Sequence, residues 1–439
     1  MGRILIAGTN SGCGKTTVTC AIMQALKNRG IDLTGFKCGP DYLDPSFVND
    51  IIGVRAYNLD SFMMTDDTIK YLLSEHESEI SVIDGVKGYY DGYMFTDKAS
   101  TSEMALITKT PTILIVDCKD MEASAAAILY GFIRYSKNTI KGVVFNRLNP
   151  LIYDGMKRVC EDLNIKCLGY IPAFKSVVSE NKNLSLVTEL EINEIKNKMM
   201  ELAKAVEKTV DIDKIIEIAK SAKPIKAKHI DIPYVGRTKI AVAHDKAFCL
   251  NYADNIEILE RMGAEIIKFS PMQDEKIPED ADGLFISGGY PEMFAAALSK
   301  NRSMLDSIKE AVHGGMPAIA ESGGFMYLHE SILDITGVSQ RMAGAISGEC
   351  TRIPPFNNYG YVEMTADSSN LLLKKGETIK TYEFHRYESS NPGSSLCARK
   401  NGEESRRIHA TNTLYAGFPH LNFYSNVKMA ERFMKACLG

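Results

Sequence analysis

The stretch Gly8–Thr17, which reads GTNSGCGKTT, separates the apolar run Arg3–Gly8 from a helical pattern that begins at Val18. Glycines in such a loop let backbone N–H groups curl around phosphate oxygens, and the first turn of the following helix adds its positive dipole end. Strand, glycine-rich loop and helix in this order predict a phosphate-binding loop at the end of the first strand of an α/β domain.

The last residues of this loop have the side chains that nucleotide chemistry needs. Lys15 would reach the β- and γ-phosphates, and Thr16 would hold Mg²⁺ through its hydroxyl. The spacing GxxxxGK[ST] fails by one place, because Gly8 lies six residues before Gly14. A subset of P-loop enzymes, of which dethiobiotin synthetase is one, shares this longer loop. The residues predicted to contact ATP are Thr9, Asn10, Ser11, Gly12, Cys13, Gly14, Lys15, Thr16, Thr17 and, for the edge of the base, Asn146.

An acidic side chain near the end of a strand is the expected second anchor for Mg²⁺. Asp84 and Asp117 each end an apolar run, and Asp91 follows in a glycine-rich turn. We predict that Asp84 joins Thr16 and Asp41 as a metal ligand. The alternative is that these aspartates only cap the helices that follow them.

The segment KCGPDYLDP, residues 37–45, crowds a lysine and two aspartates into a Gly-Pro turn after the second strand. A substrate whose carboxylates are activated by ATP would need both a cation and a magnesium-holding acid there. A solvated turn with ordinary Asp-Pro chemistry is the alternative. The residues predicted to bind the substrate are Lys37, Asp41, Tyr42 and Asp44.

The stretch Met316–Leu328, MPAIAESGGFMYL, repeats the order strand, sharp turn and helix, with a serine in the turn. This geometry lifts a nucleophile clear of a sheet and leaves backbone N–H groups beside it. One strand earlier stand Gly288 and Gly289, whose amides would face a developing oxyanion. With His420 near the end of the chain as a base, Ser322 and the two glycines follow the plan of a triad-type glutamine amidotransferase.

Two features depart from that plan. Many such enzymes carry a glutamate two residues after the histidine, where this chain has Asn422, so we expect His420 to lack an orienting carboxylate. Glutamine hydrolysis through a thioester exploits the nucleophilicity of a thiol, which Ser322 does not supply. We therefore predict weak glutaminase activity. The alternative is a serine esterase that uses Glu383 or Glu388 as the acid partner of the histidine.

The bulk composition is that of an ordinary globular protein. A net charge of −4 favours neither nucleic acid nor a membrane surface as a partner. The 10 cysteines are scattered without a CxxC pair, which predicts free thiols rather than disulfides or zinc. The first residues do not resemble a signal peptide, and we expect a cytoplasmic protein.

Short apolar strands alternate with amphipathic helices in both halves of the chain, which predicts two α/β domains with parallel sheets. Between them lies a stretch rich in lysine and proline. We predict an N-terminal domain over 1–225, a linker over 226–236 and a C-terminal domain over 237–439. The first is expected to be a P-loop domain like that of dethiobiotin synthetase, and the second a class I glutamine-amidotransferase-like domain.

Motifs over nearly the whole chain resemble the cobyrinate a,c-diamide synthase family. They are GTNSGCGKTT, FKCGPDYLDPSF, YNLDSFM, IDGVKGYYDG, FCLNYADNIEILERMGAEIIKFSP, GLFISGGYPE, AESGGFMYL, YEFHRYES and GFPHLNFYSN. The family carries cysteine at the position of Ser322 and lacks the glutamate after His420. Ser322 is interpreted as an engineered inactivating replacement in preference to a natural loss, because its surroundings still fit a working site. A further departure is SENKNLSLV, residues 179–187, where the family more often has an arginine-histidine pair.

The resemblance implies ATP- and glutamine-dependent amidation of the a and c acetates of cobyrinate through acyl phosphates, with Mg²⁺. Cobyrinate, glutamine and ATP are the expected partners, and a homodimer is left open. Nickel-sirohydrochlorin, a related tetrapyrrole with the same two acetates, is the alternative substrate. A partitioning-type ATPase switch would be a binding module, and it would have no use for a second catalytic domain.

Overall fold

The computed structural model describes residues 2–173, 189–353 and 358–439. The chain divides into two compact units, Met1–Ile230 and Asp231–Gly439, and each has a core of its own. Within the described residues, no helix combines the length and the apolar character that crossing a bilayer requires.

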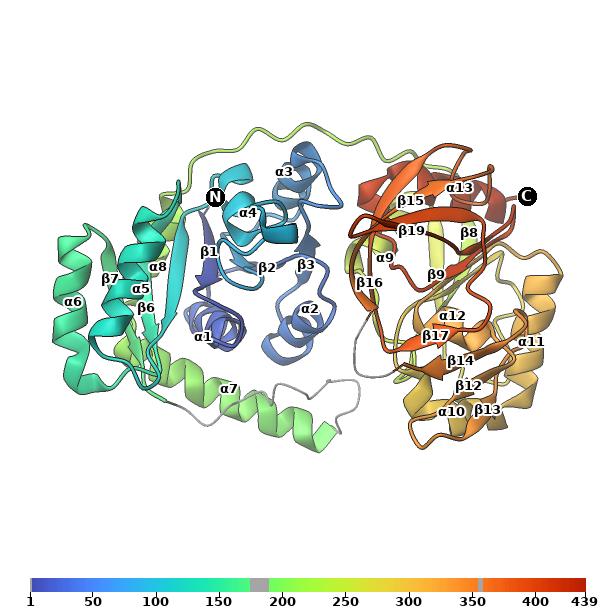
Figure 1. Cartoon of the computed structure of the whole chain (residues 1–439), viewed down its shortest axis with the longest axis horizontal. Coiled ribbons are helices and arrows are strands. Elements are labelled where there is room, and N and C mark those ends of the chain that lie inside the picture. Colours follow the sequence, from blue (N-terminus) through green and yellow to red (C-terminus); the bar gives the residue numbers. More distant parts are fainter. Residues whose placement is uncertain (1, 174–188, 354–357) are drawn as a thin grey trace. The chain divides into compact units, whose positions relative to one another are not determined.

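The first unit is built on a sheet of seven parallel strands in the order β3-β2-β4-β1-β5-β6-β7 (Figure 1). The strands are β1 (Gly2–Gly8), β2 (Leu33–Cys38), β3 (Ala56–Leu59), β4 (Ile80–Asp84), β5 (Thr112–Asp117), β6 (Ile140–Asn146) and β7 (Lys166–Ile171). The helices and helical turns are α1 (Lys15–Asn28), α2 (Leu43–Phe47), η1 (Val48–Ile52), α3 (Asp66–Glu75), η2 (Tyr93–Phe95), α4 (Thr101–Ile107), α5 (Ala123–Arg134), η3 (Pro150–Ile152), α6 (Tyr153–Asp162), α7 (Glu189–Thr209) and α8 (Ile212–Lys220).

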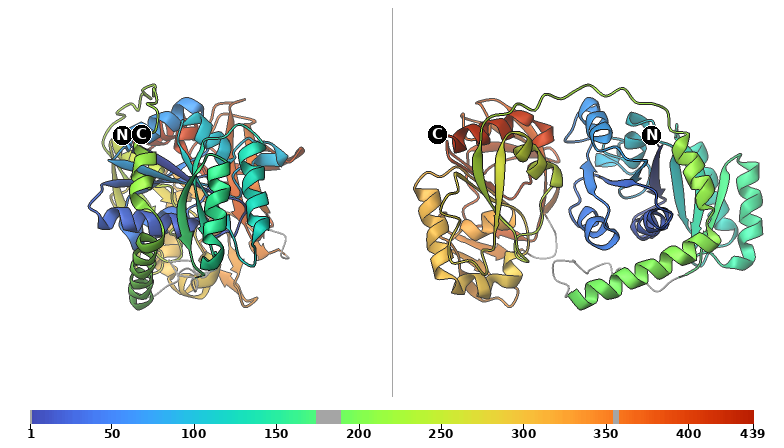
Figure 2. Two further views of the ribbon diagram at one scale, coloured as in Figure 1. Left: turned by 90° about the vertical axis from the view of Figure 1, so that its left-hand side faces the viewer. Right: turned by 180° about the vertical axis from the view of Figure 1, so that it is seen from behind.

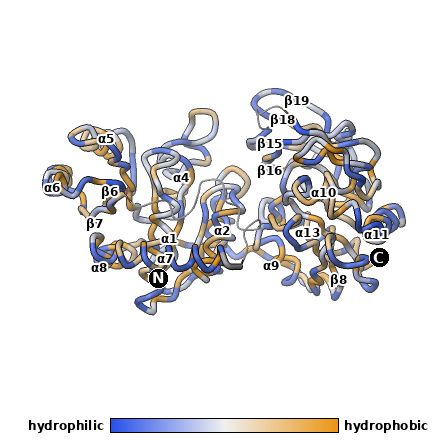
Figure 3. The backbone as a smooth tube through the Cα atoms, turned by 90° about the horizontal axis from the view of Figure 1, so that it is seen from below, coloured by the Kyte–Doolittle hydropathy of each residue, from blue (hydrophilic) through white to orange (hydrophobic). Residues whose placement is uncertain are grey.

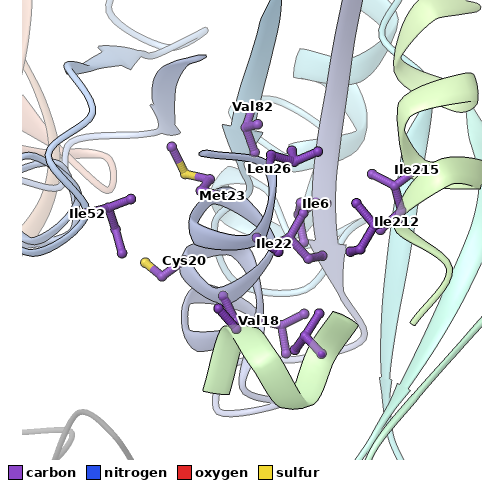
Figure 4. Close-up of a cluster of buried hydrophobic side chains, with 14 of the residues drawn as sticks. Ile6, Val18, Cys20, Ile22, Met23, Leu26, Ile52, Val82, Ile212 and Ile215 are labelled. Carbon is purple, nitrogen blue, oxygen red and sulfur yellow. The ribbon is translucent and has the colours of Figure 1, made fainter. Parts of the chain in front are cut away.

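Alternate residues of the central strands supply one face of the core of this unit. Ile4 and Ile6 of β1 point with Ile113 and Ile115 of β5 toward α1, α7 and α8. Figure 4 shows part of this cluster, in which side chains of α1 meet those of α8. Helix α7, the long light-green helix of Figure 2, contacts both α1 and β7. The central strands are buried along nearly their whole length, and a layer of helices lies above this face, as expected for the predicted parallel α/β architecture.

The second unit has a central sheet in the order β20-β21-β11-β10-β8-β9, parallel except for β20. Its strands are β8 (Thr238–Ala243), β9 (Ala264–Phe269), β10 (Gly283–Ile286), β11 (Ala318–Glu321), β20 (His409–Ala410) and β21 (Leu414–Gly417). Its helices and helical turn are α9 (Ala253–Arg261), α10 (Pro291–Lys300), α11 (Arg302–His313), α12 (Gly323–Leu328), η5 (Phe423–Ser425) and α13 (Val427–Cys437). Hydrophilic and hydrophobic stretches alternate along the helices of both units in Figure 3, as expected for helices with one buried side.

Two small sheets lie between β11 and β21 in the sequence, and the sequence analysis did not predict them. The first has the order β13-β12-β14-β17 and the second β16-β15-β18-β19. Their bounds are β12 (Ser331–Leu333), β13 (Ser339–Arg341), β14 (Glu349–Arg352), β15 (Asn358–Ala366), β16 (Thr378–His385), β17 (Tyr387–Ser389), β18 (Leu396–Lys400) and β19 (Glu403–Arg407).

Candidate functional sites

The glycine-rich loop between β1 and α1 is held by the last residue of β6 and the residue that follows it. Gly14 has a φ of 85°, in the left-handed region, and an added Cβ would overlap the side-chain amide of Asn146. The Asn146 amide donates to the Cys13 carbonyl at 2.8 Å. Arg147 donates to the Gly12 carbonyl at 3.0 Å and forms an ion pair with Asp117. Asn146 thus braces the loop backbone, and its role in reading the base stays a prediction.

Asp84, at the end of β4, lies directly beside the start of α1. Its carboxylate accepts hydrogen bonds from Thr19 at 2.9 Å and from Thr16 at 3.2 Å. The ammonium groups of Lys37 and Lys15 lie 2.6 and 3.4 Å from it. Burial acts to raise the pKa of Asp84, and the two ammonium groups outweigh burial, so the pKa lies below its ordinary value. The structure therefore presents an ionised carboxylate next to the predicted phosphate loop.

Lys37, at the end of β2, is buried and bridges two carboxylates. Its Nζ lies 2.5 Å from Asp44 Oδ2 and 2.6 Å from Asp84 Oδ2. Burial acts to lower the pKa of Lys37, and the two carboxylates raise it well above its ordinary value. Thr16 also donates to Asp44, at 3.1 Å. The side-chain oxygens of Thr16, Asp44 and Asp84 thus lie close together, and this group of oxygens stabilises a positive charge placed among them.

Asp41 is not part of this cluster of oxygens. Its Oδ1 accepts the backbone N–H groups of Leu43 and Asp44, at 2.9 and 3.2 Å, at the start of α2. Burial and the neighbouring Asp44 carboxylate raise the pKa of Asp41 to about 6. Of the two acids in the turn, Asp44 faces Thr16, although we predicted Asp41 as the metal ligand and Asp44 as a substrate residue. Tyr42 stands half-buried between them.

The oxygens of Thr16, Asp44 and Asp84 fit a magnesium ion by chemical type, because Mg²⁺ prefers carboxylate, hydroxyl and phosphate oxygens. In the described part of the chain, no three His, Cys, Asp or Glu side chains form a metal-binding group. A Mg²⁺ ion here would therefore need phosphate oxygens or water to complete its coordination. The other two acids considered are engaged elsewhere, since Asp117 pairs with Arg147 and Asp91 accepts the N–H of Gly88 at 3.0 Å. Residues 179–187 lie outside the described residues.

Ser322 occupies the sharp turn between β11 and α12. Its φ of 49° and ψ of −108° are a conformation that side-chain-bearing residues rarely adopt, at a cost of about 1–3 kcal/mol. The turn is fixed by hydrogen bonds, because Ser322 N–H donates to Gly417 O at 2.8 Å and Gly324 N–H donates to Ser287 O at 3.1 Å. Backbone strain held by neighbouring strands is the geometry of a nucleophile elbow.

The turn after β10 lies against this elbow and against His420. A Cβ built on Gly323 would lie 3.0 Å from the Gly289 amide nitrogen, and one built on Gly288 would lie 2.6 Å from His420 Cε1. His420 and Ser322 are both buried, with 2% and 7% of their surface exposed. The structure thus gathers Ser322, His420 and the Gly288–Gly289 turn at the carboxyl ends of β10, β11 and β21.

His420 does have a carboxylate neighbour, contrary to the expectation from the sequence. Glu321 Oε2 lies 3.6 Å from His420 Nδ1. Asn422, which stands where many triad-type amidotransferases carry a glutamate, accepts the backbone N–H of Tyr424 at 2.9 Å. The expectation was wrong because β11 and β21 are parallel neighbours in which Glu321 pairs with Gly417, a proximity that sequence distance does not reveal. A carboxylate immediately before the elbow serine was the missed signal.

The two acids proposed for an esterase are both used elsewhere. Glu383 is fully buried and pairs with Lys400 at 2.6 Å and Arg407 at 3.0 Å. Glu388 is exposed and accepts a hydrogen bond from Asn358 at 3.2 Å.

Comparison with known families agrees with the two sites. Residues 4–187 match the CobQ/CobB/MinD/ParA nucleotide binding domain, and residues 239–428 match the CobB/CobQ-like glutamine amidotransferase domain. A nucleotide-binding domain followed by a glutamine amidotransferase domain defines a class of enzymes that form C–N bonds, and this chain is one of them.

The relatives identify the family. Cobyrinate a,c-diamide synthase of Thermoplasma volcanium is 38% identical over 99% of this chain and 97% of the relative. The enzyme of the same name from Caldanaerobacter subterraneus is 36% identical over 99% and 98%, and that of Listeria monocytogenes is 38% identical over 99% of both chains. The chain belongs to the cobyrinate a,c-diamide synthase family.

Proposed function

We propose that this chain amidates the a and c acetate carboxylates of cobyrinate in an ATP-dependent reaction, in cobalamin biosynthesis. The relatives named for this activity align with the chain from end to end. The observation that carries the proposal is the cluster around Asp84, where the cations of Lys15 and Lys37 meet the oxygens of Thr16 and Asp44. Such a site suits the transfer of a phosphoryl group to a carboxylate, because both reactants are anions.

The proposed reaction has two steps. A carboxylate oxygen of the substrate attacks the γ-phosphorus of ATP, the bond to the ADP oxygen breaks, and an acyl phosphate forms. The nitrogen of ammonia then attacks the acyl carbon, phosphate leaves, and a proton is lost from nitrogen to give the amide. A Mg²⁺ ion held by Thr16, Asp44 and Asp84 would reduce the negative charge of the phosphates. Lys15 and Lys37 would place their ammonium groups against the phosphates and the substrate carboxylate.

The second unit would supply the ammonia. Glutamine hydrolysis needs a nucleophile at position 322, a base at His420 and amides of the Gly288–Gly289 turn facing the oxyanion. By resemblance, the nucleophile of the family is a cysteine. A serine hydroxyl is a weaker nucleophile than a thiolate at neutral pH, so we propose that free ammonia is the effective nitrogen source for this chain.

ADP formation that depends on added cobyrinate tests the proposal. With ATP, Mg²⁺ and ammonium chloride, we expect ADP and the diamide only when cobyrinate is present. Ni-sirohydrochlorin in place of cobyrinate tests the alternative substrate, and amidation of that tetrapyrrole alone would replace cobyrinate in the proposal. ADP release at the same rate without either tetrapyrrole would overturn the proposal in favour of an ATPase switch.

A further inference from the structure

Glu321 and His420 form a buried pair beside the elbow of the second unit. Glu321 has 3% of its surface exposed, and its Oε2 lies 3.6 Å from His420 Nδ1. Among the described residues, the His420 ring is the one basic group within ion-pair distance of Glu321. Burying a carboxylate is costly unless hydrogen bonds or a cation compensate. A histidine is charged only when protonated, so its place beside this carboxylate suggests a role in proton transfer.

We propose that Glu321 is a positioning residue, whose carboxylate orients the His420 imidazole for proton transfer at position 322. An Nδ1–H that faces the carboxylate fixes the tautomer in which Nε2 is free to accept a proton. When Nε2 takes the proton of the nucleophile, the imidazolium is stabilised by the same carboxylate. This proposal rests on the glutaminase role given above to the second unit.

A backbone hydrogen bond holds the carboxylate itself in place. Its other oxygen, Oε1, accepts the backbone N–H of Leu421 at 2.9 Å, so Glu321 bridges the backbone and the side chain of consecutive residues. Glu321 is also the last residue of β11, paired in register with Gly417 of β21. A carboxylate fixed at both its backbone and one oxygen has little freedom to turn away from the ring.

The segment that carries the histidine is fixed from three further directions. The His420 N–H donates to Tyr382 O at 2.8 Å. Asn255 of α9 donates to Leu421 O and accepts the N–H of Phe423, both at 2.8 Å. Gly288 packs against the ring, where an added Cβ would lie 2.6 Å from Cε1. This backbone is therefore rigid around the one side chain whose orientation matters for proton transfer.

A second buried group on the same face of the sheet responds to the charge of Glu321. Tyr415 pairs with Ile319, two residues before Glu321 on β11. Burial first, and then the Glu321 carboxylate, raise the pKa of Tyr415 well above its ordinary value. Glu321 therefore lies close enough to act electrostatically on a second buried group of this sheet.

The test uses the full chain with Ser322→Cys, because the pH dependence of the reactivity of the introduced thiol shows the influence of His420 on it. Glu321→Gln and Glu321→Asp are each added to this background. Glu377→Gln is the matched control, because Glu377 pairs with Arg432 at 2.5 Å in the same unit and does not contact His420. Ammonia-driven diamide synthesis is measured for each variant, together with glutamine-driven synthesis. Alkylation of the introduced thiol by iodoacetamide is followed as a function of pH, by mass spectrometry of the peptide that contains position 322.

We expect Glu321→Gln to lower kcat with glutamine by about 100-fold or more, by analogy with removal of the carboxylate from other triads, with KM and the ammonia-driven rate unchanged. The alkylation profile should move to higher pH, because an imidazolium without its carboxylate stabilises the thiolate less. Glu321→Asp should recover part of the rate, and Glu377→Gln should match the Ser322→Cys parent.

Two results would overturn the proposal. One is an alkylation profile for Glu321→Gln that coincides with the parent, and the other is a parallel loss of ammonia-driven and glutamine-driven rates. If the parent makes no diamide from ammonia, the proposed function fails. The alkylation profile still decides the role of Glu321 in that case, because it requires neither cobyrinate nor ATP.

Discussion

At the scale of single residues, position 322 combines a strained backbone with a side chain that differs from its family by one atom. The φ of 49° is fixed by the backbone of the turn and does not depend on the side chain, because the turn is hydrogen-bonded to the last residue of β21 and to the residue after β10, the two neighbours of β11. Serine and cysteine have the same shape apart from the longer bond to sulfur. We therefore expect the site to accept either residue with little change in geometry.

Ser322→Cys should raise glutamine-driven diamide synthesis by about 100-fold or more while leaving the ammonia-driven rate unchanged, because only the first depends on the nucleophile. The measurement is diamide formation with each nitrogen donor in turn. Equal glutamine-driven rates in the serine and cysteine proteins would show that the hydroxyl is not the limiting feature.

Gly288→Ala should disable the same half-reaction through a different cause. The new methyl group would lie 2.6 Å from His420 Cε1 and would displace the ring. In the Ser322→Cys background we expect a loss of glutamine-driven rate of about 10-fold or more, with ammonia-driven synthesis retained. Gly131→Ala is the control, since a Cβ there has no heavy atom within 4 Å. An unaffected glutamine-driven rate in Gly288→Ala would mean that the ring is not confined as described.

At the scale of elements, the parallel strands of the first unit bring distant residues to one edge. Lys37 comes from the end of β2, Asp84 from the end of β4, and Thr16 from the first turn of α1. Open α/β sheets bind ligands at the carboxyl ends of their strands. Polar residues at the ends of predicted strands therefore indicated this edge of the sheet. The choice between Asp41 and Asp44 depended on α2, a helix of only five residues that the sequence did not predict.

The substitutions Asp44→Asn and Asp41→Asn distinguish the roles of the two acids in this turn. Asp44→Asn should raise the Mg²⁺ concentration needed for half-maximal activity by about 10-fold, because a charged oxygen is lost beside Thr16. Asp41→Asn should chiefly weaken the start of α2, at a cost of about 1 kcal/mol or less, because asparagine also caps helices. Titration of activity with Mg²⁺, together with urea unfolding, distinguishes them, and the reverse pattern would support the ligand set predicted from the sequence.

Glu383 on β16 makes the small sheet sensitive to acid. Burial acts to raise its pKa, while the neighbouring His385, Arg407 and Lys400 lower it from 4.5 to about 2. A carboxyl with a depressed folded-state pKa stabilises the fold above its unfolded-state value, and this stabilisation is lost as the pH falls from 4.5 toward 2. The difference corresponds to about 3 kcal/mol.

Urea unfolding at several pH values measures this effect. Glu383→Gln should be less stable than the wild type at pH 7, and the gap should narrow as the pH falls below about 4.5. The exposed Glu388→Gln should follow the wild type throughout. A gap that stays constant down to about pH 2 would contradict the ion-pair explanation.

At the scale of the whole molecule, the two units have separate cores, and residues 222–237 between them contain no helix or strand. Lys228 in this segment pairs with Asp67 of the first unit, at an exposed site. We predict that limited trypsin digestion cuts first after Lys226 or Lys228 and leaves two fragments near the predicted domain bounds. Circular dichroism of the nicked protein should retain the native spectrum. A first cut inside either sheet would count against the predicted boundary.

Much of this protein was determined by local sequence signals. Short apolar runs and glycine-rich turns predicted most of the parallel strands from β1 to β11 and the loop before Lys15, because these features arise from residues within a few positions of one another. The elbow at Ser322 followed from the same kind of pattern. The sheet of β12, β13, β14 and β17 escaped prediction because its strands are only three or four residues long, and in the other small sheet β19 is largely exposed and carries no apolar run.

Only the tertiary structure decided which side chains meet. Glu321 lies 99 residues before His420, and their contact follows from the parallel pairing of β11 and β21. The bridge of Lys37 between Asp44 and Asp84 likewise follows from the order of β2 and β4 in the sheet. The sequence specifies each strand through local preferences, whereas strand order and register are set by burial of the whole core, and that collective choice brings distant charges together.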